Sequence, residues 1–388
     1  MDNITYLART NHPRRQVRFG IREEDRFSHM YVVGKTGVGK TTFLKNMILQ
    51  DLKHGNGIAL FDPHGDLVDE VINAIPPYRR HDLIYFDVPN SNCPLRYNPV
   101  KNVSRDKRPL VASGIMETFR KQFGEKAWGN RMEHILRNCL LTLLDQPIAD
   151  LADILILLND KDGREAFLEN VENESVLDFW RKEYAKLPPF TRQAAIAPIQ
   201  NKVGALMSNP VCKRILVSNS QDVYLRKAME EKKILIFNLS KGKIGEDASN
   251  LLGGLLVTSL ALAAYSRQDI HESHRVPFYI YCDEFQNFTT GFFANALSEL
   301  RKYKVGLILA HQYLTQIDSD VRSAVLGNIG TTIVFRLSHT DATYFSKEFD
   351  GRFSASDITH LPNLDMYMRL MVNGSTCKAF SCAVERSP

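Results

Sequence analysis

Eight residues near the start of the chain have the types and spacing of a phosphate-binding loop. They run from Gly34 to Thr41 and fit the pattern G-x-x-x-x-G-K-[ST]. In such a loop the glycines let backbone N–H groups wrap nucleotide phosphates, the lysine places its charge against the β- and γ-phosphates, and the final hydroxyl ligates Mg²⁺. The N-terminus of the helix that follows adds its dipole to the site. The predicted binding residues are Gly34, Lys35, Thr36, Gly37, Val38, Gly39, Lys40, Thr41 and Thr42.

Two consecutive carboxylates, Asp283 and Glu284, end an apolar run much later in the chain. Beside a bound nucleotide, Asp283 would hold Mg²⁺ through water together with the hydroxyl of Thr41. Glu284 would orient and deprotonate the attacking water. Such a pair on its own is typical of a solvated strand end, so the functional interpretation depends on the phosphate-binding loop upstream.

The next apolar run, Val305–Ala310, ends in a further candidate, Gln312. If the two runs are neighbouring strands, Gln312 lies beside the carboxylates and can sense the γ-phosphate and water. Arg301 opens the turn into this run, and at a subunit edge it could neutralise transition-state charge in a neighbouring subunit's site. Arg336, on the following predicted strand, is the second candidate for that role.

The elements that must position these residues alternate between strand-like and helix-like patterns. Near-continuous apolar runs are typical of parallel strands covered on both faces. The expected strands are residues 29–33, 57–62, 82–88, 232–240, 278–285, 305–312 and 331–337, and residues 366–384 are expected to form two edge strands. We therefore expect an α/β fold with a mainly parallel sheet, interrupted by an all-α domain.

Three parts of the chain follow from these patterns. Residues 1–28 hold six arginines and few apolar residues, so we expect a basic N-terminal arm or a short leading strand. Residues 29–103 and 222–388 are expected to form one discontinuous nucleotide-binding domain. Helical periodicity dominates residues 104–221, which we expect to be the inserted all-α domain.

Composition excludes several classes of protein. With 388 residues, 44% hydrophobic and 24% charged, the chain is neither disordered, collagenous nor a coiled coil. A net charge of +5 is compatible with a polyanionic partner without requiring one. The six cysteines show no metal-binding spacing and are expected to be reduced thiols of a cytoplasmic protein. The apolar stretch Leu251–Tyr265 is too short to span a bilayer and predicts a buried helix.

Taken in order, the motifs resemble the HerA/FtsK superfamily of hexameric DNA-pumping ATPases, and within it the coupling proteins of conjugative type IV secretion. The resemblance covers nearly the whole chain and rests on GKTGVGKTTFLKNMILQDL, FDPHGD, WGNRMEHILRNCLLTLLD, IFNLSKGKIGED, YCDEFQNF, LILAHQ and GNIGTTIVFRL. It implies a RecA-like P-loop core, ATP and Mg²⁺ as cofactors, a homohexameric ring and movement of DNA. It assigns the roles above to Lys40, Thr41, Asp283, Glu284, Gln312 and Arg301.

The chain also departs from this family. Membrane coupling proteins begin with transmembrane helices and HerA proteins with a β-barrel, and the first 28 residues supply neither. We therefore expect a soluble, minimal, cytoplasmic member without direct membrane insertion, which docks at the inner face of the membrane through partners such as a relaxase or secretion-channel proteins. DNA, single- or double-stranded, would be bound without sequence preference through phosphates, with Lys241 and Lys243 as candidate contacts in a loop.

Two alternative functions remain open at this point. One is a HerA-like translocase for DNA-end processing or defence. The other is an ATP-gated adaptor that recruits a relaxase–DNA complex without pumping. The intact set of Lys40, Asp283 and Glu284 argues against an inactive module but does not separate switching from pumping.

Overall fold

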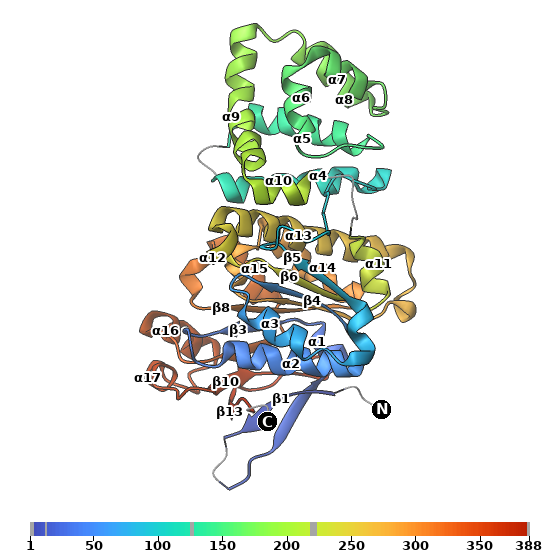
Figure 1. Cartoon of the computed structure of the whole chain (residues 1–388). Helices are drawn as coiled ribbons and strands as arrows, with labels where there is room; N and C mark the ends of the chain where they lie inside the picture. Colours follow the sequence, from blue (N-terminus) through green and yellow to red (C-terminus); the bar gives the residue numbers. More distant parts are fainter. Residues whose placement is uncertain (1–3, 12–13, 125–127, 218–222, 386–388) are drawn as a thin grey trace. The chain divides into compact units, whose positions relative to one another are not determined.

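The computed structural model describes residues 4–11, 14–124, 128–217 and 223–385 (Figure 1). The chain divides into two compact units. Unit one comprises Met1–Asp87, Leu225–Ser240 and Ala263–Pro388, and unit two comprises Val88–Tyr224 and Lys241–Leu262. The domain boundary expected between residues 221 and 222 lies outside the described residues, and the expected division into domains stays a prediction.

Unit one is built on one large sheet. Over the described residues it has 11 strands, in the order β2-β1-β13-β10-β9-β3-β8-β7-β4-β6-β5. The bounds are β1 (Ile4–Thr10), β2 (Arg18–Arg22), β3 (Met30–Val33), β4 (Gly57–Asp62), β5 (Leu83–Asp87), β6 (Ile234–Asn238), β7 (Phe278–Cys282), β8 (Val305–His311), β9 (Thr331–Val334), β10 (Asp365–Arg369) and β13 (Phe380–Ala383). From β5 to β9 every neighbouring pair is parallel, and from β9 to β2 every pair is antiparallel. The expected α/β fold with a mainly parallel sheet is confirmed.

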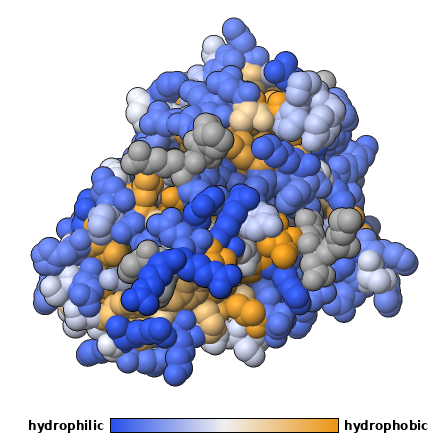
Figure 2. All heavy atoms as spheres, turned by 90° about the horizontal axis from the view of Figure 1, so that it is seen from below, coloured by the Kyte–Doolittle hydropathy of each residue, from blue (hydrophilic) through white to orange (hydrophobic). Residues whose placement is uncertain are grey.

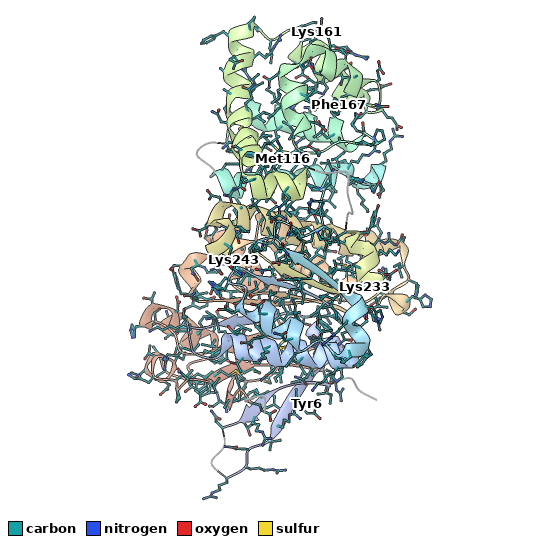
Figure 3. The ribbon with its side chains drawn as sticks, in the orientation of Figure 1. Tyr6, Met116, Lys161, Phe167, Lys233 and Lys243 are labelled. Atoms are coloured by element: carbon teal, nitrogen blue, oxygen red, sulfur yellow. The ribbon has the colours of Figure 1, made fainter. Side chains whose placement is uncertain are left out.

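The two ends of the chain extend this sheet together. Strand β1 pairs with β13 on one side and with β2 on the other. Of the two expectations for residues 1–28, the short leading strand is confirmed by β2, and the basic arm is wrong for residues 4–10 and 18–22, because they form strands. Residues 366–384 contribute two strands to the sheet, β10 and β13, as expected, but their expected position at the edge is wrong, since β1 and β2 continue the sheet beyond β13. Tyr6, labelled in Figure 3, marks β1.

The helices of unit one pack against the parallel strands. Helices α2 and α3 lie side by side and contact β4 (Figure 1). Apolar side chains of α2 and the central strands, among them Phe43 and Leu60, are fully buried in the core. The bounds are α1 (Glu23–Arg26), α2 (Lys40–His54), α3 (Asp66–Asn73), α11 (Leu225–Glu230), α14 (Gly291–Leu300), α15 (Ser319–Asn328), α16 (His339–Glu348) and α17 (Ala355–Thr359). A short hairpin of β11 (Met371–Val372) and β12 (Ser375–Thr376) forms a second sheet.

Unit two is helical in its described elements. They are α4 (Arg108–Phe123), α5 (Asn130–Leu144), α6 (Asp153–Asn159), α7 (Lys161–Leu168), α8 (Glu174–Asp178), α9 (Pro189–Ser208), α10 (Pro210–Leu216), α12 (Lys241–Ile244) and the first part of α13 (Glu246–Ser266). By length and composition Glu246–Asp269 could cross a membrane, and 72% of its apolar window is buried in the protein. A core helix meets the same criterion, and the buried helix expected over Leu251–Tyr265 is confirmed. The face in Figure 2 is mostly hydrophilic, with apolar residues in scattered groups.

Candidate active site

The carboxyl ends of four parallel strands meet at one edge of the sheet. In the parallel register, Val33 of β3 lies opposite His311 of β8, and Phe61 of β4 lies opposite Cys282 of β7. In open α/β sheets, ligands bind at such carboxyl ends. The phosphate-binding loop after β3, the carboxylates after β7 and the glutamine after β8 are therefore brought to the same place.

The loop after β3 has the backbone that its glycines permit. Gly39 has φ 119°, a conformation that L side chains rarely adopt, and a Cβ atom there would approach Leu364 Cδ2 to 2.8 Å. Lys40 begins helix α2, and its Nζ donates hydrogen bonds to the carbonyls of Gly34 (2.6 Å) and Lys35 (3.0 Å). The ammonium group is therefore folded over the loop, at the place where phosphates would bind.

The carboxylate of Glu284 is fixed by two amide donors. Gln312 Nε2 donates to Oε1 at 2.8 Å, and Gln286 Nε2 donates to Oε2 at 2.6 Å. Glu284 has φ 48° and ψ 48°, a left-handed conformation at a non-glycine residue. Such backbone strain is typically stored at functional sites. Gln312, a candidate from its place at a strand end, thus contacts the carboxylate it was expected to adjoin.

Asp283 lies in an excess of negative charge. Burial, Glu284 and Asp62 raise the pKa of Asp283 to about 6, and Lys40 opposes the rise. The described residues hold no cluster of three or more His, Cys, Asp or Glu side chains arranged for a metal. Mg²⁺ usually binds through one or two carboxylates, several waters and substrate phosphates, so the donor set of Asp283 and the Thr41 hydroxyl fits that ion.

A cavity of about 380 Å³ collects these groups. It is lined by Thr36, Gly37, Gly39, Lys40, Thr41, Thr42, His64, Asp283, Glu284, Gln312, Asn363 and Leu364. Sequence reasoning missed Asn363 and Leu364, which come from just before β10, and it gave His64 no role. A second cavity of about 550 Å³ shares Thr36 and Gln312 with the first and also includes Lys35 and Asp341.

The two arginine candidates lie at opposite ends of the parallel strands, Arg301 before β8 and Arg336 after β9. Arg301 is exposed and begins the 3-10 turn η8 (Arg301–Tyr303) before β8. The length of β8 separates it from Gln312 by about 20 Å. The structure therefore does not bring Arg301 into the site of its own subunit. Arg336 lies nearer, since its guanidinium donates to the carbonyl of Leu361 (3.1 Å) and to Asn363 Oδ1 (2.8 Å).

The raised pKa of Asp283 predicts a stability that depends on pH. Its pKa rises from an ordinary 3.8 to about 6 on folding, so ionisation destabilises the fold increasingly between those values. At pH 7 without Mg²⁺ or nucleotide, Asp283→Asn should raise the free energy of unfolding by about 3 kcal/mol. Below pH 4 the gain should vanish. Denaturant unfolding at both pH values, with a chelator, checks this, and equal stability at pH 7 would contradict it.

Comparison with known proteins adds a family and a fold. One protein-family model, described as the type IV secretion-system coupling protein DNA-binding domain, matches residues 16–360. No curated protein matches the chain in sequence.

Solved structures match over almost the full chain. The plasmid coupling protein TrwB in complex with ADP and Mg²⁺ matches with a TM-score of 0.71 at 16% identity, over 95% of this chain and 88% of that one. VirB4 of Thermoanaerobacter pseudethanolicus matches with a TM-score of 0.64 at 12% identity, over 99% of this chain and 96% of that one. At such identities the likeness shows the fold, a large and mostly parallel sheet with a RecA-type core.

Proposed function

The chain belongs to the family of type IV secretion-system coupling protein DNA-binding domains, and on that premise we propose that it is an ATP-hydrolysing DNA translocase that acts as a homohexameric ring. The observation that carries the proposal is the convergence of Lys40, Asp283, Glu284 and Gln312 on one cavity beside the phosphate-binding loop. ATP and Mg²⁺ are the proposed cofactors. TrwB, which shares the fold, has been solved with ADP and Mg²⁺.

The residues of the cavity would each have a separate role in hydrolysis. With phosphates bound, Lys40 exchanges the carbonyls of Gly34 and Lys35 for phosphate oxygens. Mg²⁺ supplies neutralising charge when held by the Thr41 hydroxyl and Asp283. Glu284, oriented by its two amide donors, accepts the proton of the attacking water.

We propose that a neighbouring subunit completes each site. Arg301 is exposed and lies about 20 Å from Gln312 of its own chain, so it serves a site only in another subunit. The second cavity shares Thr36 and Gln312 with the first, and such an arginine would enter there. A trans-acting arginine typically contributes about 10³–10⁵ in turnover.

DNA would be held through its phosphates. Lys241 and Lys243 were expected in a loop and instead belong to the short helix α12, where Lys243 is exposed (Figure 3). Lys241 also pairs with Glu246 at 3.2 Å, so Lys243 is the more available of the two. We propose that residues 104–221, which fall within unit two, form the inserted helical domain, and that relaxase or secretion-channel partners dock the ring at the membrane.

Phosphate contacts predict binding that depends on salt and not on sequence. Each phosphate contact contributes about −0.9 to the slope of log affinity against log salt on duplex DNA. Lys243→Ala should therefore flatten the slope by about one and weaken two unrelated oligonucleotides equally. Lys161→Ala, an exposed lysine on α7, is the matched control and should change neither value. Salt-independent binding, or an equal loss in the control, would contradict the assignment.

A triplex-displacement assay distinguishes a motor from an adaptor. A translocase should displace a third strand from a triplex-bearing duplex when ATP is present, and should fail with a non-hydrolysable analogue. An adaptor should bind both ATP and DNA and leave the third strand in place under either condition.

A further inference from the structure

His29 is a buried junction immediately before strand β3. Its backbone N–H donates to Arg26 O at 3.1 Å, and its carbonyl accepts from Thr331 N at 3.2 Å. Its ring bonds to Leu297 O through Nε2 (2.8 Å) and accepts from Leu307 N–H at Nδ1 (3.2 Å). The residue is 1% exposed. It holds φ at 62°, a left-handed conformation in which non-glycine residues are uncommon.

These contacts fix the tautomer of the ring. Because Leu307 N–H donates to Nδ1, that nitrogen carries no proton, and Nε2–H therefore donates to the carbonyl of Leu297. Burial, with a smaller contribution from the nearby charge of Arg301, lowers the pKa of His29 to about 4, although the bond to Leu297 opposes this. The ring is therefore neutral near pH 7 and can make both bonds at once.

The two ring contacts lie on either side of the turn that carries the arginine. Leu297 is in the last part of α14, Leu307 is in β8, and Arg301 begins η8 between them. We propose that His29 is a positioning residue, whose ring holds the Arg301 turn where the nucleotide site of the adjacent subunit requires it. This inference rests on the proposed function.

The same residue joins that turn to its own subunit's phosphate-binding loop. Strand β3 starts directly after His29, is fully buried, and ends one residue before Gly34. The length of β3, about 13 Å, therefore separates His29 from the loop. A shift of the loop along β3 would be transmitted to the arginine turn by the side chain of His29.

Three single variants test the positioning role. His29→Asn is too short to reach Leu297, so it should lower turnover about 10²-fold, the cost of a misplaced catalytic group, with unchanged affinity for a fluorescent ATP analogue. His29→Gln retains the donor to Leu297 and should lose less. Phe27→Leu alters buried packing at the same junction without touching the ring contacts, and is the matched control.

The mixtures distinguish the inference from the proposed function. His29→Asn mixed with Lys40→Ala subunits should regain turnover. At some interfaces of such a ring, the intact loop of a His29→Asn subunit meets the well-placed arginine of a Lys40→Ala subunit. His29→Asn mixed with Arg301→Ala should not. If Arg301→Ala and Lys40→Ala rescue each other while His29→Asn and Lys40→Ala do not, the role of His29 is overturned and the ring mechanism stands. If neither pair recovers although mixed rings form, the trans-acting arginine fails, and His29 with it.

Discussion

Glu284→Gln is expected to bind ATP as the wild type does and to lose turnover by about 10²–10⁴-fold. The substitution keeps the shape of the side chain and removes the group that accepts the proton of water. It also places an amide between the amide donors of Gln312 and Gln286, of which only one can still donate to it. Binding of a fluorescent ATP analogue and steady-state hydrolysis, measured on the same preparation, separate an effect on ATP affinity from an effect on turnover.

A matched change outside the site controls for the loss of a carboxylate. Glu299 lies on α14 and pairs with the exposed Lys302 at 2.7 Å. Glu299→Gln should leave turnover within twofold of the wild type, because exposed ion pairs contribute little. Wild-type turnover in Glu284→Gln would show that Glu284 is not the catalytic base.

Arg301→Ala is expected to lower turnover by about 10³–10⁵-fold without weakening nucleotide binding. The guanidinium lies far from its own subunit's cavity, so Arg301→Ala should lower turnover only in the assembled ring. Mixing Arg301→Ala with Lys40→Ala subunits should restore part of the turnover, because some interfaces then pair an intact loop with an intact arginine.

Two further variants show whether this effect belongs to Arg301. Lys302→Ala removes the adjacent exposed cation and should have little effect. Arg336→Ala disrupts the bonds to Leu361 and Asn363 beside the cavity. A large loss in Arg336→Ala that mixing with Lys40→Ala does not rescue, together with near-normal Arg301→Ala, would transfer the role to an arginine acting within its own subunit.

The sequence predicted the parts of the site that local patterns encode. A glycine-rich loop between a buried strand and a helix, and polar residues at the ends of Phe278–Cys282 and Val305–His311, are readable one segment at a time. Parallel strands align their carboxyl ends, so these segments meet at one edge of the sheet if their strands are neighbours, as β7 and β8 are. Gln312 and Glu284 were placed together on this reasoning, and the structure joins them by a hydrogen bond.

Long-range contacts were beyond such reasoning. Strand β1 pairs with β13 across almost the whole chain, and the arginines of residues 1–28 suggested an arm because nothing nearby in the sequence reveals a partner. Leu364 reaches the phosphate-binding loop through its backbone N–H, which donates to Val38 O at 2.8 Å, and leaves no sequence signal. His29 carries no motif, since its contacts come from elements that are separate in sequence.

Helix boundaries were also set by context. Pro198 lies inside helix α9, which runs from Pro189 to Ser208, although proline disfavours a helix interior. A proline inside a helix forfeits one backbone hydrogen bond, and the buried face formed by Ile196, Ile199 and Val203 offsets that loss. Local propensity is a weak guide where such packing decides the outcome.

ATP turnover per chain, measured across protein concentration with and without DNA, tests the central claim most directly. If each site is completed by the arginine of a neighbour, turnover per chain should rise with concentration as rings assemble. DNA that templates the ring should raise it further at low concentration, and Arg301→Ala should remain inactive throughout. Full turnover in a strictly monomeric preparation without DNA would contradict the account.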